Sequence, residues 1–158
     1  MKNILVPTDF SDNAYSALYY ATRLFKNEPC RFHILNTLDP DSAIIGGKGD
    51  QQVINESKEK LTEVLHTIVR DTEDYDHSFE IISTTEKLLE TIEKTVKNKG
   101  IDLIVMGTKG ATGAKGFFIG STTSNVIQKI KCCPVLAVPD EFNFEETLKT
   151  AITKEHSI

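Results

Sequence analysis

Short apolar runs alternate along this chain with longer segments whose apolar residues recur every three or four positions. Continuous apolar runs are typical of strands covered on both faces, and the periodic segments are typical of amphipathic helices. We therefore predict an α/β fold of three α/β/α layers, with an open, parallel, doubly wound five-stranded sheet. The expected strands are Ile4 to Val6, Cys30 to Leu38, His77 to Ser83, Ile101 to Met106 and Pro134 to Val138, and the expected helices are Asp12 to Lys26, Gln51 to Arg70, Glu86 to Lys99 and Ser121 to Lys131.

Two residues mark expected helix ends. Ser11 is a favourable N-cap for the first helix, and Gly100 stands where a left-handed residue would end the third. The first helix has an apolar face formed by Ala14, Ala17, Leu18, Ala21, Leu24 and Phe25. Residues 140–158 are acidic and then mixed, and they fit either a short helix or a docking strand. We expect one domain over residues 1–139, followed by this tail.

A glycine-rich segment connects the fourth expected strand to the fourth expected helix. Gly107, Gly110 and Gly120 precede Ser121 and Thr122, which stand at the helix start. Glycines let backbone N–H groups approach a ligand, and a helix N-terminus offers unpaired N–H donors that suit phosphate. The spacing matches neither a Walker A loop nor the dinucleotide fingerprint. The segment predicts a phosphate site of another design, and the alternative is a long, flexible connection that happens to be rich in glycine.

Two lysines of this segment are open to two interpretations. Lys109 and Lys115 would either neutralise phosphate charge or remain solvated loop residues. Asp9, directly after the first strand, is also ambiguous. If the first strand lies between the second and the fourth, in the order 3-2-1-4-5, Asp9 and the glycine-rich segment flank one crevice. A carboxylate there is suited to ribose hydroxyls, which predicts a nucleotide ligand, and the alternative is an Asx-turn or helix-start residue.

Composition excludes several other classes of function. A net charge of −5 and a pI near 5.4 argue against nucleic-acid binding. There is no run of about 18 apolar residues, so no membrane span is expected. The sequence also shows no signal-peptide pattern. Three cysteines, with no C-x-x-C pattern, favour a reducing cytoplasm. The four histidines are scattered, so we expect no metal site formed by protein side chains.

Several motifs together resemble the universal stress protein family. They are the segments Val6 to Ser11, Asp102 to Gly110, Gly120 to Thr122 and Cys133 to Pro139, and the resemblance spans about Lys2 to Pro139. The pattern G-x2-G-x9-G-[ST] is specific to the ATP-binding members of that family. The resemblance implies an adenine-nucleotide α-hydrolase-like fold and a regulatory, stress-response role. It also implies a homodimer formed through the fifth strand, at Val135, Leu136, Ala137 and Val138.

The resemblance assigns roles residue by residue. Asp9 would bind the ribose hydroxyls, with Gly107 packed nearby, while Asn36 and Thr37 would meet adenine through backbone hydrogen bonds. The family usually has a His-Val pair there, so Asn36-Thr37 is a mild departure. Any magnesium would be held by the phosphates of ATP. The full candidate set is Pro7, Thr8, Asp9, Asn36, Thr37, Met106, Gly107, Thr108, Lys109, Gly110, Gly120, Ser121 and Thr122.

Binding is a more economical interpretation than catalysis. Phosphoryl transfer needs a group that orients the nucleophile, and the glycine-rich segment contains no carboxylate or glutamine. We therefore predict a nucleotide-dependent regulator, with weak ATP hydrolysis at most. The alternatives are a slow ATPase or nucleotide-dependent transferase using the same pocket, and an interaction module that binds no nucleotide.

Overall fold

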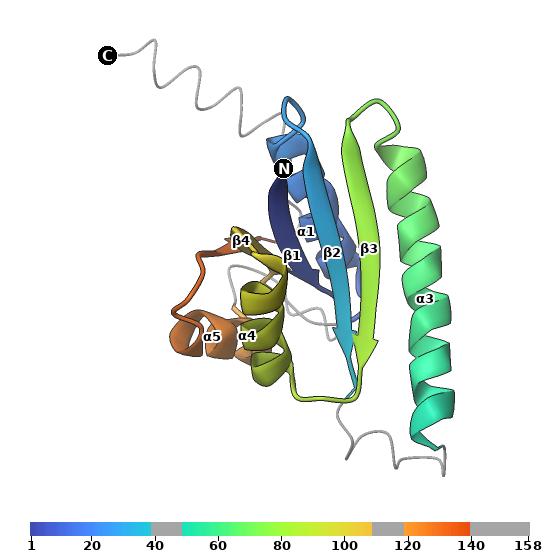
Figure 1. Ribbon diagram of the computed structural model, residues 1–158, viewed down its shortest axis with the longest axis vertical. Helices are drawn as coiled ribbons and strands as arrows, with labels where there is room; N and C mark the ends of the chain where they lie inside the picture. The colour runs from blue at the N-terminus through green and yellow to red at the C-terminus, as the bar shows by residue number, and fades with distance from the viewer. Residues whose placement is uncertain (39–48, 109–118, 140–158) are drawn as a thin grey trace.

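The computed structural model describes residues 1–38, 49–108 and 119–139. Its five strands are all parallel and follow the order β3-β2-β1-β4-β5, which confirms the predicted sheet. The first four of them are labelled in Figure 1. The strands are β1 Lys2–Pro7, β2 Cys30–Thr37, β3 His77–Thr84, β4 Leu103–Gly107 and β5 Val135–Val138. The helices are α1 Asp12–Leu24, α3 Asp50–Asp71, α4 Leu88–Lys99 and α5 Ser121–Lys129.

The sheet separates two hydrophobic cores, which gives the predicted three layers. One core joins α1 and α3 to the sheet through residues that include Leu18, Leu61 and Phe32. The other joins α4 and α5 to the opposite face through residues that include Ile92, Val126 and Leu5. Alternate residues of β1 enter opposite cores because successive side chains of a strand point to opposite faces. Both faces of the sheet are therefore covered, as the continuous apolar runs predicted.

Both expected helix ends are confirmed. The Ser11 hydroxyl accepts a hydrogen bond from the Ala14 N–H at 3.1 Å, which satisfies an unpaired donor of the first turn of α1. Gly100 has φ 61, the left-handed conformation that glycine adopts at low cost.

Several boundaries and one burial differ from the sequence-based expectation. β4 begins at Leu103 rather than Ile101, because the Ile101 N–H still bonds the Val96 carbonyl at the end of α4. α5 ends at Lys129, two residues early, since the backbone is already extended at Ile130. Leu24, which was expected on the buried face of α1, is 41% exposed. No helix in the described part of the chain has the length and apolarity to span a membrane.

Candidate functional site

The carboxyl ends of β1 and β4 meet at one edge of the sheet. These strands are direct neighbours, paired in register from Ile4 with Leu103. The segments that follow them, from Thr8 and from Thr108, therefore leave the sheet side by side. The carboxyl ends of β2 and β3 point the same way, toward the bottom of Figure 1. In open parallel sheets ligands bind beyond this edge, between neighbouring strands whose connections diverge.

The turn after β1 is held by its own side chains. The Thr8 N–H donates to the Leu35 carbonyl at 2.7 Å, and the Thr8 hydroxyl accepts from the Phe10 N–H at 3.0 Å. The Asp9 carboxylate accepts from the Ser11 N–H at 3.0 Å. One of its two oxygens therefore forms the Asx-turn that was the alternative interpretation of Asp9. Phe10 has φ 66, a conformation that is costly for an aromatic residue and frequent at functional sites. Asp9 itself is exposed.

The base of the glycine-rich segment is closed by three hydrogen bonds. The Thr108 N–H donates to the Val138 carbonyl at 3.1 Å, and the Gly120 N–H donates to the Thr108 carbonyl at 2.6 Å. The Thr123 hydroxyl donates to the Gly107 carbonyl at 2.7 Å. These bonds bring both ends of the segment to the end of β4. Two predicted site residues, Lys109 and Gly110, lie outside the described residues, as does Lys115.

The N-terminus of α5 has the features of an anion site. Gly120 is its N-cap and offers no side chain to cap the helix, and no acidic residue occupies the first turn. The first N–H of α5 to bond back is that of Ser124, which donates to the Gly120 carbonyl at 2.9 Å. The N–H groups of residues 121–123 therefore precede the intrahelical ladder and carry the positive end of the helix dipole. Ser121 and Thr122 are exposed beside them.

The remaining predicted residues lie in the hydrophobic core or at the end of β2. Pro7 is buried at the end of β1, and the Met106 side chain is buried between the sheet, α4 and α5, so Met106 can offer a ligand only its backbone. Thr37 is half-buried at the end of β2. The Asn36 side-chain amide donates to the Thr8 carbonyl at 2.8 Å, so this N–H is already used within the protein and is not offered to a ligand.

Sequence reasoning missed two residues that shape this edge. Thr123 clamps the end of β4, and the run Ser121-Thr122-Thr123-Ser124 gave no signal of which hydroxyl would turn inward. Asn13 is buried against Gly107, where a Cβ would lie 2.1 Å from its Oδ1. The sequence signal that could have identified Asn13 is its position, a polar residue beside the apolar face of α1. In the described ranges, no three histidine, cysteine, aspartate or glutamate side chains group closely enough to hold a metal ion.

Comparisons with known proteins agree with this architecture. The model of the universal stress protein family matches residues 1–139. Universal stress protein MJ0577 of Methanocaldococcus jannaschii is 34% identical, over 87% of this chain and 94% of the relative. A solved structure of MJ0577 superimposes with a TM-score of 0.67 at 32% identity, covering 90% of this chain and 98% of that one.

A more distant solved structure shares the fold. It is the universal stress protein from Archaeoglobus fulgidus in complex with dAMP, with a TM-score of 0.59 and 21% identity. It covers 87% of this chain and 97% of that one. The family match over residues 1–139 and the similarity to MJ0577 agree with the motifs at the ends of β1 and β4. This chain belongs to the universal stress protein family.

Proposed function

We propose that this protein binds ATP at the carboxyl edge of β1 and β4 and acts as a nucleotide-dependent regulatory module. One observation carries the proposal: an exposed carboxylate and a helix N-terminus with glycine as its N-cap follow two strands that are direct neighbours. The first is suited to ribose hydroxyls and the second to phosphate. The dAMP complex of the Archaeoglobus fulgidus relative supports an adenine nucleotide as the ligand class.

The phosphates would bind at the start of α5. Residues 121–123 offer backbone donors there, and the hydroxyls of Ser121 and Thr122 are exposed. The absence of an acidic side chain from this first turn leaves the positive field of the helix uncompensated. Gly110, and Lys109 as a counter-charge, would complete the cradle. Magnesium would be held by the phosphates of ATP rather than by protein carboxylates.

The nucleoside would lie against the turn after β1. Asp9 would accept hydrogen bonds from the ribose, while its Asx-turn bond to Ser11 keeps the carboxylate in place. Pro7 and Thr8 would form the wall of the nucleoside pocket, and the backbone at Asn36 and Thr37 would meet adenine.

A reducing cytoplasm is the proposed location of the protein. Three free thiols, at Cys30, Cys132 and Cys133, agree with it.

Isothermal titration calorimetry with ATP and magnesium tests the proposal. We expect saturable binding with one site per chain, and a rise in melting temperature of about 5–10 °C at ATP near 100 times Kd. Gly120→Val should abolish binding, because its side chain would stand among the helix N-terminal amides. Asp9→Asn keeps an oxygen for the Ser11 N–H but loses the charge, so it should weaken ATP about tenfold. Absence of ATP binding by the unmodified protein would contradict the proposal.

Controls separate the site from general stability. Asp76→Ala removes an exposed carboxylate just before β3, at the opposite edge of the sheet, and should leave ATP affinity unchanged. Circular dichroism should show that Gly120→Val remains folded. Phosphate release in the same samples distinguishes the regulator from a slow ATPase or transferase. Turnover well above the buffer rate, lost in Gly120→Val, would establish the enzyme instead.

A further inference from the structure

We propose that Asn36, Ser57 and Ser83 form a positioning relay that fixes the Thr8–Asp9 peptide and so aims the Asp9 carboxylate at the ribose. The inference deepens the proposed nucleotide site and rests on it. The relay side chains come from β2, α3 and β3, and none of these side chains needs to touch the ligand. They would act on affinity through Asp9 alone.

The relay is a continuous chain of hydrogen bonds. The Ser83 hydroxyl donates to the Ser57 hydroxyl at 2.9 Å, and the Ser57 hydroxyl donates to the Asn36 Oδ1 at 2.8 Å. The Asn36 Nδ2 then donates to the Thr8 carbonyl at 2.8 Å. Asn36 and Ser57 are buried, at 7% and 3% exposure. Water therefore competes little for these bonds, and losing one partner would leave a buried polar group unsatisfied.

The direction of every bond follows from one carbonyl. The Thr8 oxygen can only accept, so it must face the Asn36 Nδ2 rather than the Oδ1. This orientation turns the Asn36 Oδ1 toward Ser57, whose hydroxyl must then donate. The same Ser57 oxygen is left to accept from Ser83. The amide orientation is therefore imposed by the network, and the relay has one satisfied arrangement.

Holding the Thr8 carbonyl also fixes the start of Asp9. The Thr8 carbonyl and the Asp9 N–H belong to one planar peptide unit, so fixing the oxygen fixes the plane from which Asp9 emerges. The Thr8 N–H is already bonded to the Leu35 carbonyl, which holds the other side of Thr8. The Asp9 carboxylate then has its own anchor on the Ser11 N–H. The side chain expected on the ribose is thus fixed at three successive points.

The surroundings indicate that the buried amide is not simply core filling. The two positions before it on β2, Ile34 and Leu35, are fully buried and apolar. An amide in such a place is costly unless all its partners are supplied. Its partners here come from two further elements, and its donor is directed at the turn that carries Asp9. This arrangement fits a positioning role for Asn36.

A double-mutant cycle on the full chain tests the relay, with ATP and magnesium as the probe. Ser57→Ala frees the Asn36 amide to rotate and should weaken ATP about three- to tenfold. In an Asp9→Ala background the same substitution should change ATP affinity less than about twofold, because the relay acts through the missing carboxylate. Ser83→Ala, at a half-buried position on the edge strand, should repeat the pattern with smaller effect.

The control removes a buried hydroxyl elsewhere. Thr95→Val deletes a hydroxyl that donates to the Thr91 carbonyl in α4 and keeps the side-chain shape. It should lower the melting temperature without changing ATP affinity. Equal ATP penalties for Ser57→Ala in both backgrounds, or no penalty in either, would overturn the relay while leaving the nucleotide site intact. If the unmodified protein binds no ATP, the proposed function fails first, and the relay fails with it.

Discussion

Gly107 is the residue at which the backbone of β4 comes closest to α1. A Cβ at this position would lie 2.1 Å from the Asn13 Oδ1 and 3.1 Å from the Asn13 carbonyl oxygen. Asn13 is buried at 6% exposure, so its side chain has little room to move away. The contact allows α1 to pack against the end of β4, beside the start of the glycine-rich segment. Glycine is required here by close approach rather than by an unusual φ.

We therefore expect Gly107→Ala to destabilise the protein by about 1–3 kcal/mol, as overpacking of a buried site does. Urea denaturation at neutral pH measures the change. Gly49→Ser is the matched control, because none of the described residues lies within 4 Å of its Cβ position and serine is favoured at this N-cap of α3. A Gly107→Ala variant as stable as the unmodified protein would show that Asn13 can shift freely.

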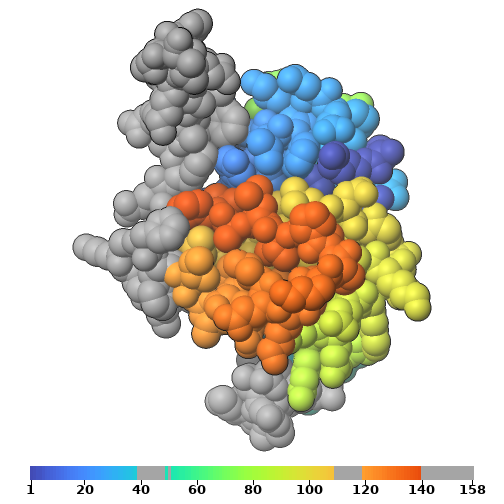
Figure 2. Space-filling view, turned by 90° about the vertical axis from the view of Figure 1, so that its left-hand side faces the viewer, coloured from blue at the N-terminus to red at the C-terminus, as the bar shows by residue number. Residues whose placement is uncertain are grey.

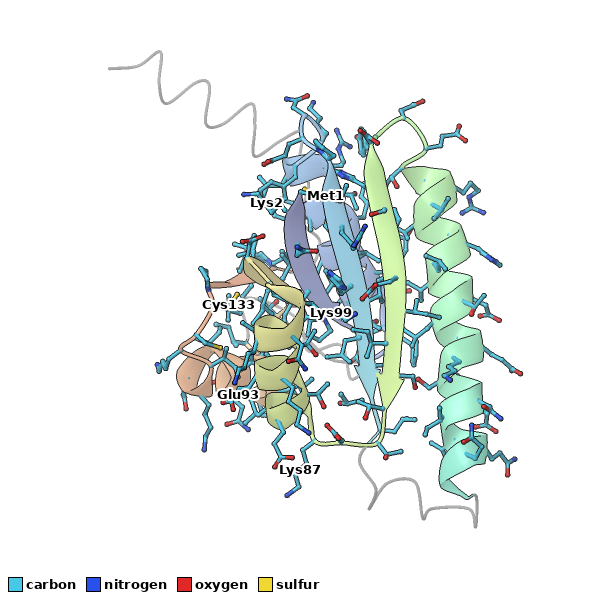
Figure 3. The ribbon with its side chains drawn as sticks, in the orientation of Figure 1. Met1, Lys2, Lys87, Glu93, Lys99 and Cys133 are labelled. Carbon is cyan, nitrogen blue, oxygen red and sulfur yellow. The ribbon has the colours of Figure 1, made fainter. Side chains whose placement is uncertain are left out.

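At the scale of elements, a polar cluster ties three strands to α4. On the face that carries α4, the His33 Nδ1 lies 2.5 Å from the Glu80 Oε1, and its Nε2 lies 3.1 Å from the Asn3 Oδ1. The Lys99 Nζ, at the end of α4 seen in Figure 3, lies 3.1 Å from the same Glu80 oxygen. His33 is buried, at 2% exposure. Glu80 is the residue through which β2, β3 and α4 are joined.

This cluster should make stability depend on acid pH. Burial of the Glu80 carboxyl works to raise its pKa, but hydrogen bonds from His33 and Lys99 outweigh it, and the net pKa is lowered. A carboxyl with a lowered pKa in the folded state contributes stability above its ordinary range, and this is lost as pH falls through the folded-state pKa. Glu80→Gln should therefore lose less stability than the unmodified protein between about pH 5 and pH 3.

Urea denaturation at each pH gives the comparison. The control is Glu93→Gln, on the exposed surface of α4, which should keep the acid dependence of the unmodified protein (Figure 3). Identical acid dependence in Glu80→Gln and the unmodified protein would mean that other carboxyls control this range.

At the scale of the whole molecule, β5 is the outermost strand on one side of the sheet. Among the described residues, this strand pairs with β4 alone. Residues 119–139, in orange and red, occupy the centre of the face seen in Figure 2. Leu136 packs on the α1 side of the sheet and Val135 on the α5 side. An edge strand with unpaired backbone groups is a template for pairing with a second chain.

We therefore retain the prediction of a homodimer through Val135 to Val138. Sedimentation velocity should show a dimer, and Ala137→Arg should convert it to a monomer, because a charge at the interface would be desolvated without a partner. Val69→Arg, at an exposed position on α3, should remain dimeric. A monomeric unmodified protein at micromolar concentration would refute the prediction, and a dimeric Ala137→Arg would place the interface elsewhere.

The sequence by itself determined the order of elements, the parallel sheet and the two covered faces. Burial periodicity is a local property of the chain, so Ile4 to Val6 or the apolar face of α1 can be recognised without knowing their neighbours. Ser11 and Gly100 were recognisable for the same reason, since caps act within one turn. The glycine-rich segment and Asp9 could be proposed as site candidates because their spacing and their place after strands are readable along the chain.

Only the tertiary structure decided which polar side chains meet. Asn36 bonds Thr8 across 28 residues and Ser57 across 21, and His33 meets Glu80 across 47. A hydrogen bond forms only when two elements are brought within about 3 Å at the right angle, and register and packing set that distance. The adenine contact expected of the Asn36 backbone stays a prediction, whereas only the structure shows that the Asn36 side chain donates to the carbonyl that precedes Asp9.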